Sequence, residues 1–316
     1  MLTMSVAGLP ALSHAQDYPA KPITIVVPMA TGGGYDLIAR YIAEPLARQL
    51  GQPVVIDNRP GAGSEIGIAY VKEAKPDGYT FLMGGSDGVT ILPAVKANVR
   101  YKVPDDFEFV ARISAFTPVV NVNANLPIKS VSDLVAYAKA NPGRVRYGTS
   151  GVGSANHLSS ALFGLTTGIK MVHVPYNGAG PSSIALASGE VDLSIVAPST
   201  IRPYVDSGKV RPIAVIGTER NSLYPDAPTM TEAGIPGVTY VVFYGLMAPA
   251  GTPKPVIERI SKEIKAIVDK PEVANWLTKT GFLPHYYMDS DEFRQAVVEE
   301  FALWTRTAKE ADISVR

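Results

Sequence analysis

The chain has 316 residues, 46% of them hydrophobic and 18% charged, which is enough apolar material to fold around one large or two smaller cores and excludes a disordered chain. Lysine plus arginine equals aspartate plus glutamate at 29 each, so no global field attracts nucleic acid or an anionic membrane surface. The absence of cysteine excludes thiolate metal sites, disulfide frameworks and thiol nucleophiles.

Residues 1–15 form a short apolar stretch that ends in Ser13-His14-Ala15, a small-residue pattern typical of a cleavage site. The positively charged start of a signal peptide is missing, so this stretch is interpreted as a residual signal peptide. It predicts a periplasmic location. No later window approaches roughly 18 uninterrupted apolar residues, and no membrane-spanning helix is expected.

From Ile23 to about Ala97, short apolar runs alternate with helical patterns. The strand-like runs are ITIVVP, VVIDN and YTFLMG, and residues 36–50 place apolar side chains at helical spacing. This order predicts a parallel sheet with right-handed crossovers.

A second β/α series follows two β-rich runs within residues 108–123. It opens with Ser130 and Asp133, which resemble a helix capping box, and continues through VRYGTS, MVHVP, VDLSIVA and RPIAVIG. Another apolar strand at 238–248 precedes three helices that are expected to pack on the first domain. The sequence therefore predicts an α/β protein with lobe 1 at 16–120 plus 246–316, lobe 2 at 121–245, and a hinge at the two crossings.

Two glycine-rich loops, one in each lobe, connect a strand to a helix. The first runs through Thr31-Gly32-Gly33-Gly34-Tyr35-Asp36, and the second through Thr149-Ser150-Gly151-Val152-Gly153-Ser154-Ala155-Asn156-His157. Free amides at a helix start favour an anion, although each loop alone also fits a tight turn. Two such loops in different lobes indicate a ligand held across a cleft.

A serine hydrolase is the alternative prediction. Gly84-Gly85-Ser86-Asp87-Gly88 matches the G-x-S-x-G nucleophile elbow, and Asp192 and His285 follow in the required order. Such matches arise easily in a chain with 28 glycines. The histidines lack the spacing of a zinc site, so no metal is expected.

Taken together, these residues resemble the Bug family, the extracytoplasmic receptors of tripartite tricarboxylate transporters. The resemblance runs from about Tyr18 to Ala311 and rests on YPAKPITIVVPMATGGGYDLIAR, GQPVVIDNRPGAGSEIG, PDGYTFLMGGSDG, SVSDLVAYAKANPG, YGTSGVGSANHL, HVPYNGAGPSSIALASGEVDL and GLMAPAGTP. It implies a Venus-flytrap periplasmic binding protein with a hinge between two Rossmann-like lobes, a small organic carboxylate as ligand and membrane transporter subunits as partners. It implies no enzyme activity and no cofactor, and we expect a monomer.

The resemblance also implies which residues bind. The two glycine-rich loops would hold one ligand carboxylate, while the loop with Ser86 and Asp87 and the segment 197–200 would shape the rest of the pocket. The expected ligand-binding residues are Thr31, Gly33, Gly34, Tyr35, Asp36, Ser86, Asp87, Thr149, Ser150, Gly153, Ser154, His157, Ala197, Ser199, Thr200 and Tyr244.

One departure from the family pattern concerns the ligand. Family members often carry Asp-Asn after the VD strand, whereas this chain reads Ser194-Ile195-Val196-Ala197-Pro198-Ser199-Thr200. Because a buried ammonium needs a carboxylate or several acceptors, we expect an uncharged-tail or aromatic carboxylate or a dicarboxylate, and not an α-amino acid. Asp87 is the residue that could contradict this expectation.

Overall fold

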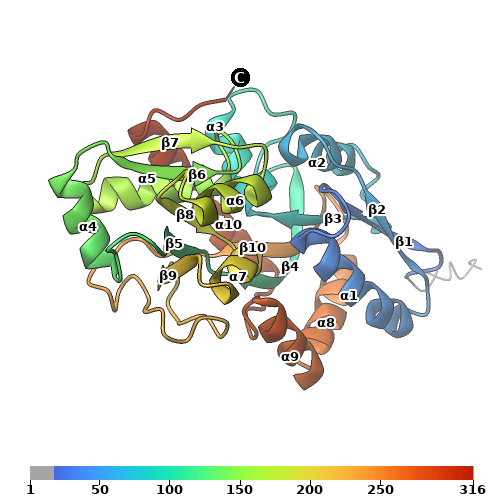
Figure 1. The fold of residues 1–316 in the computed structure, drawn as a ribbon. Helices are drawn as coiled ribbons and strands as arrows, with labels where there is room; N and C mark the ends of the chain where they lie inside the picture. The colour runs from blue at the N-terminus through green and yellow to red at the C-terminus, as the bar shows by residue number, and fades with distance from the viewer. Residues whose placement is uncertain (1–17, 316) are drawn as a thin grey trace, which may run out of the picture.

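Two sheets with helices on their faces build the protein, as shown by a computed structural model that describes residues 18–315 (Figure 1). The signal peptide expected at residues 1–15 lies outside this range. Within residues 18–315, no helix combines the length and apolar character needed to cross a membrane.

The first lobe holds a five-stranded sheet in the order β2-β1-β3-β10-β4. Its elements are β1 (Ile23–Val27), α1 (Gly34–Leu50), β2 (Val54–Asn58), the short 3₁₀ turn η1 (Ala62–Ser64), α2 (Glu65–Lys72), β3 (Thr80–Gly85), the π-helical turn η2 (Asp87–Ile91), α3 (Leu92–Val95) and β4 (Phe107–Phe116), joined later by β10 (Val242–Pro249), α8 (Lys254–Val268), α9 (Pro271–Thr280) and α10 (Ser290–Glu310). The parallel pairing predicted by the sequence is confirmed for β1 with β2 and β3. The sheet as a whole is mixed, because β10 returns from the other lobe and runs antiparallel to β3 and β4.

The second lobe repeats the plan with the strand order β7-β6-β8-β5-β9. Its elements are β5 (Val119–Asn123), α4 (Val131–Ala140), β6 (Val145–Thr149), α5 (Ala155–Thr167), β7 (Met171–Pro175), α6 (Ala179–Ser188), β8 (Leu193–Val196), α7 (Pro198–Asp206) and β9 (Val210–Val215). One half of the predicted capping box of α4 is present, since the Asp133 amide donates to the Ser130 hydroxyl at 3.1 Å, while the Asp133 carboxylate accepts the Lys129 amide at 2.9 Å.

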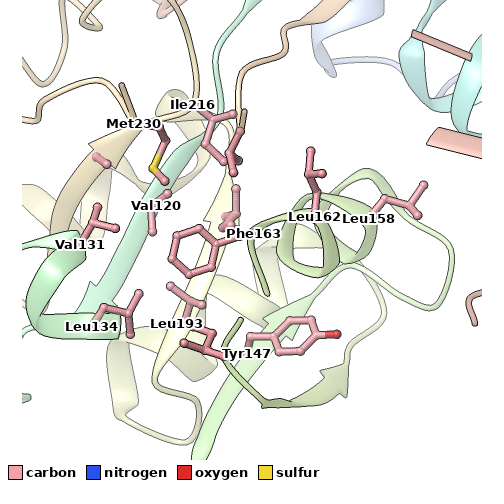
Figure 2. Close-up of a cluster of buried hydrophobic side chains, with 14 of the residues drawn as sticks. Val120, Val131, Leu134, Tyr147, Leu158, Leu162, Phe163, Leu193, Ile216 and Met230 are labelled. Carbon is pink, nitrogen blue, oxygen red and sulfur yellow. The ribbon is translucent and has the colours of Figure 1, made fainter. Parts of the chain in front are cut away.

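Apolar side chains cover both faces of each sheet. In the first lobe, one face packs against α1, α8 and α9 and the other against α2 and α10. In the second lobe, α4 and α5 cover one face and α6 and α7 the other. Figure 2 shows part of the α4–α5 side, where Phe163 lies near Val120 and Leu193. Burying one such phenylalanine contributes about 1.5–3 kcal/mol.

The two chain crossings lie side by side. β4 ends at Phe116 and β5 begins at Val119, while Val242 at the start of β10 pairs with Phe116. This pairing places both crossings at one junction between the sheets. The lobe bounds at residues 16–120 plus 246–316 and 121–245 remain predictions from the sequence.

Helix α10 differs from the expectation that the C-terminal helices pack on the first lobe. Phe293 and Val297 in its first half do so, but Trp304 and Ala308 in its second half belong to the core of the second lobe. The reason is its length, because 21 residues at 1.5 Å per residue extend past one sheet. One helix therefore ties the two lobes together.

Candidate functional site

Two adjoining cavities occupy the space between the lobes. The outer cavity has a volume of about 400 Å³ and the inner one about 200 Å³, and both are lined by Phe116, Ala197 and Thr200. Residues within two positions of the ends of β3, β6 and β8 line them, which is the usual ligand position in open α/β sheets. Together the cavities form an elongated cleft.

The first glycine-rich loop opens onto the outer cavity. Gly33 and Gly34 line the cavity, and Gly33 is the N-cap of α1 without a side-chain hydrogen bond to the helix. A side chain at Gly34 would meet the Tyr244 ring, with its Cβ 2.9 Å from Cζ, so this close approach requires glycine. The loop thus presents backbone amides at a helix start. Thr31 is exposed and is not among the residues that line either cavity.

Asp36 serves the loop itself. Its buried carboxylate accepts hydrogen bonds from the Gly32 amide, the Asn58 amide group and the Arg40 guanidinium, each at 2.9 Å. Burial alone would raise the pKa of Asp36, but these hydrogen bonds and the Arg40 charge lower it overall. Asp36 therefore stays ionised and holds the loop, and the structure does not bring it into the cleft lining.

Tyr35 and Tyr244 form the floor between the outer cavity and the buried core. Their rings pack edge to face with centroids 4.9 Å apart, and Tyr244 lines the outer cavity. Tyr35 is buried beneath it and donates its hydroxyl to Asp87 at 3.2 Å. Burial raises the pKa of Tyr35, so this hydroxyl keeps its proton and remains a donor.

Asp87 lines the inner cavity. Burial raises the pKa of its carboxyl, and the hydrogen bond from Tyr35 only partly opposes this effect. The adjoining Ser86 is fully buried, and its hydroxyl accepts the Phe243 amide of β10 at 3.0 Å. Ser86 thus joins the end of β3 to β10, whereas Asp87 faces the inner cavity.

The second glycine-rich loop is held by its own side chains. Thr149 Oγ1 lies 2.6 Å from His173 Nε2, the Gly153 amide donates to His157 Nδ1 at 3.1 Å, and the Ser154 hydroxyl donates to the Gly151 carbonyl at 2.7 Å. Ser150 lines the inner cavity and donates to Asn156 at 2.7 Å. Burial, reinforced by the stacked His173, lowers the pKa of His157 to about 4, so this ring is neutral at pH 7.

The remaining predicted residues lie at the start of α7. Ala197 and Thr200 line both cavities, and Ser199 lines the outer one. Ala197 is the N-cap of α7 and offers no side-chain cap. The structure thereby brings part of the predicted set together in one cleft, namely Gly33, Gly34, Asp87, Ser150, Ala197, Ser199, Thr200 and Tyr244.

Four helices begin at this cleft. The first residues of α1 and α7 line the outer cavity, and those of α5 and α6 line the inner one. The first-turn amides of a helix lack partners within that helix, and its dipole adds partial positive charge at this end. Residues from both lobes therefore create a surface that favours an anion without a buried arginine.

Other cleft residues were not predicted. Asn156 and Ala179 lie in the first turns of α5 and α6, and their positions could have been found by the same reasoning as Ser150, since Asn156 belongs to the second glycine-rich stretch of the sequence. The sequence holds no comparable signal for Arg202, Leu223, Lys279 or Phe282, which converge on the outer cavity from separate elements.

The geometry of a serine hydrolase is not formed. Ser86 is buried against β10, and Asp192 lies in the other lobe with its carboxylate bound by the Arg146 amide at 2.8 Å and by the Arg146 guanidinium. His285 lies exposed in a turn. A triad needs these groups within hydrogen-bond reach of one another, so the match to the nucleophile elbow is a structural turn. Across residues 18–315, no three histidine, aspartate or glutamate side chains gather as a metal site would require.

Comparison with known proteins agrees with this architecture. The family model of the tripartite tricarboxylate transporter family receptor matches residues 38–313. The protein BugT from Bordetella pertussis is 31% identical over 318 residues, an alignment that covers 99% of this chain and 96% of that protein.

Solved structures show the same fold. A Rhodopseudomonas palustris protein with adipate is 34% identical, with a TM-score of 0.81 and coverage of 94% of this chain and 99% of that one. The periplasmic binding protein BugD is 30% identical, with a TM-score of 0.77 and coverage of 95% and 100%. MatC from Rhodopseudomonas palustris, with bound malate, is also 30% identical, with a TM-score of 0.77 and coverage of 92% and 99%. The chain therefore has the two-lobed α/β fold of periplasmic binding proteins and belongs to the tripartite tricarboxylate transporter receptors, the family that includes the Bug proteins.

Proposed function

We propose that this protein is a periplasmic receptor that captures a small organic carboxylate between its lobes and delivers it, as a monomer, to the membrane subunits of a tripartite tricarboxylate transporter. The observation that carries the proposal is the convergence of four helix starts on one cleft. Family membership supports the transport role, and relatives that bind adipate and malate support a carboxylate ligand.

The carboxylate is proposed to lie where the two cavities meet. There the first loop and the start of α7 line the outer cavity, while Ser150 and the start of α5 line the inner one. Hydrogen bonds to a charged ligand are roughly twice as strong as neutral ones. A carboxylate at this junction would contact both lobes, so binding would favour the closed arrangement.

The ligand is proposed to lack an ammonium group. Asp36 is already bound by three donors, and the segment 194–200 contains no acid. Asp87 remains, but its raised pKa means that the inner cavity disfavours a carboxylate charge at that position. An uncharged-tail, aromatic or dicarboxylic acid fits this lining better than aspartate or glutamate does.

A thermal-shift screen tests the proposal. Succinate, adipate, citrate, benzoate and the phthalate isomers are compared with aspartate and glutamate. A ligand at a hundredfold its dissociation constant adds about 2.7 kcal/mol to stability, which gives a clear shift. Small-angle scattering with the best ligand should then show a smaller radius of gyration. Stabilisation by the amino acids alone contradicts the ligand class, and no stabilisation by any acid contradicts the receptor itself.

A further inference from the structure

Two cations face the outer cavity from opposite lobes. Arg202 belongs to α7 of the second lobe and Lys279 to the last turn of α9 in the first, and both line this cavity. Helices α7 and α9 both reach this cavity, and Figure 1 shows α7 above α9 in the lower part of the view. No aspartate or glutamate of the described chain lines the same cavity.

Neither cation is neutralised by a strong partner. Arg202 lies 3.6 Å from Asp206 on its own helix, and both side chains are more than half exposed, so this pair is weak. Lys279 is exposed and makes no ion pair within residues 18–315. Both side chains therefore keep donors available for a ligand.

The charges along the cleft are unequally distributed. Asp87 is the acid that lines the inner cavity, and no cation of the described residues lines it. The outer cavity has the opposite character, with two cations between the apolar side chains of Leu37, Leu223 and Phe282. A ligand with one anionic group at the junction and a second at the outer end matches this pattern.

On the basis of the proposed function, we infer that Arg202 and Lys279 together bind a second anionic group of the ligand and so determine specificity for dianions over monocarboxylates. Because one cation lies on each lobe, an anionic group that contacts both attracts the two lobes toward it. The second charge thus adds both affinity and a bias toward the closed state.

Matched pairs of acids test the inference, because members of a pair differ in one carboxylate. Adipate is compared with hexanoate, succinate with butyrate, and terephthalate with benzoate, by calorimetric titration of the full chain. In the wild-type protein, the dianion of the best pair should bind at least about tenfold more tightly. The double variant Arg202→Gln and Lys279→Gln should lose roughly tenfold or more of that affinity while its affinity for the monocarboxylate stays within about twofold.

A control variant, Lys262→Gln, removes an exposed cation from α8, whose residues do not line the cleft. It should leave both affinities unchanged at 0.15 M salt, where distant charges are screened. An equal fall for dianion and monocarboxylate in the double variant, or no fall for either, overturns the role of the two cations but leaves a carboxylate receptor. Absence of binding by every acid in the wild-type protein overturns the proposed function as well.

Discussion

The two glycine-rich loops start helices at the same cleft, yet they use their polar groups differently. The first has no side-chain cap at Gly33, and its carboxylate Asp36 holds the loop from behind. The second is fixed by Ser154, His157 and His173, which satisfy hydroxyls and amides inside the loop. From this difference we propose that the first loop offers amides to the ligand, whereas the second forms a preorganised wall.

Acid should weaken the second loop most. The ordinary pKa of histidine is 6.5 and that of His157 is about 4, so the stability from its neutral form is present above pH 6.5 and is lost as the pH falls through 4. We expect a loss of about 2–3 kcal/mol over this window. His157→Asn retains an acceptor for the Gly153 amide. Urea unfolding at several pH values should show that the free energy of unfolding of this variant depends less on pH than that of the wild type. The control variant His285→Asn, at an exposed position, should keep the wild-type dependence of the free energy of unfolding on pH. If the His157 variant also keeps this dependence, the His157 ring does not control stability in acid.

The first loop should be sensitive to one added methyl group. Gly34→Ala places a Cβ atom against the Tyr244 ring. Because the loop must move to relieve this overlap, ligand binding should weaken by about 1–3 kcal/mol. Gly33→Ala is the matched control, since its nearest neighbour is the Ala30 carbonyl oxygen at 3.7 Å. Calorimetry should show that the affinity for the ligand falls roughly tenfold or more in Gly34→Ala and less than about threefold in the control. Equal affinities would mean that loop position does not govern binding.

Glu300 should respond to pH in the opposite direction to His157. Burial raises the pKa of this α10 carboxyl to about 7. The nearby Asp87 raises the pKa further, whereas hydrogen bonds from Trp304, Ser86 and Thr90 lower it in part. Stability from its protonated form is full below pH 4.5 and is lost as the pH rises through 7. Glu300→Gln should therefore gain about 1–2 kcal/mol relative to wild type at pH 8 and nothing at pH 4.5. Glu299→Gln, at an exposed neighbour, should show no such gain; a gain at both pH values would exclude titration of Glu300 as the cause.

The smallest effect is expected at Ser154. Its hydroxyl accepts the His157 amide at the start of α5 and donates to Gly151, so Ser154→Ala should lower the free energy of unfolding by about 0.5–1 kcal/mol. Affinity should stay within about threefold, because the hydroxyl serves the loop. A larger loss of affinity without a loss of stability would place Ser154 in direct contact with the ligand.

The sequence predicts the parts of the site that lie on short local patterns. Alternating strands and helices and the glycines before α1 and α5 locate both lobes and both loops, because backbone amides at helix starts follow from chain order alone. Side chains that meet only in the folded protein were not predictable. Arg202 and Lys279 lie on different lobes, and Ser86 meets Phe243 only because β10 returns to the first sheet.

The path of α10 has a consequence for biosynthesis. Its first half completes the core around Phe293 and its second half the core around Trp304, so each lobe needs residues that are translated after all the strands of both sheets. Neither lobe can complete its core before α10 is made, although many multidomain proteins fold domain by domain. The nascent chain should remain sensitive to protease until α10 has emerged, and the finished molecule should then acquire resistance in both lobes at once.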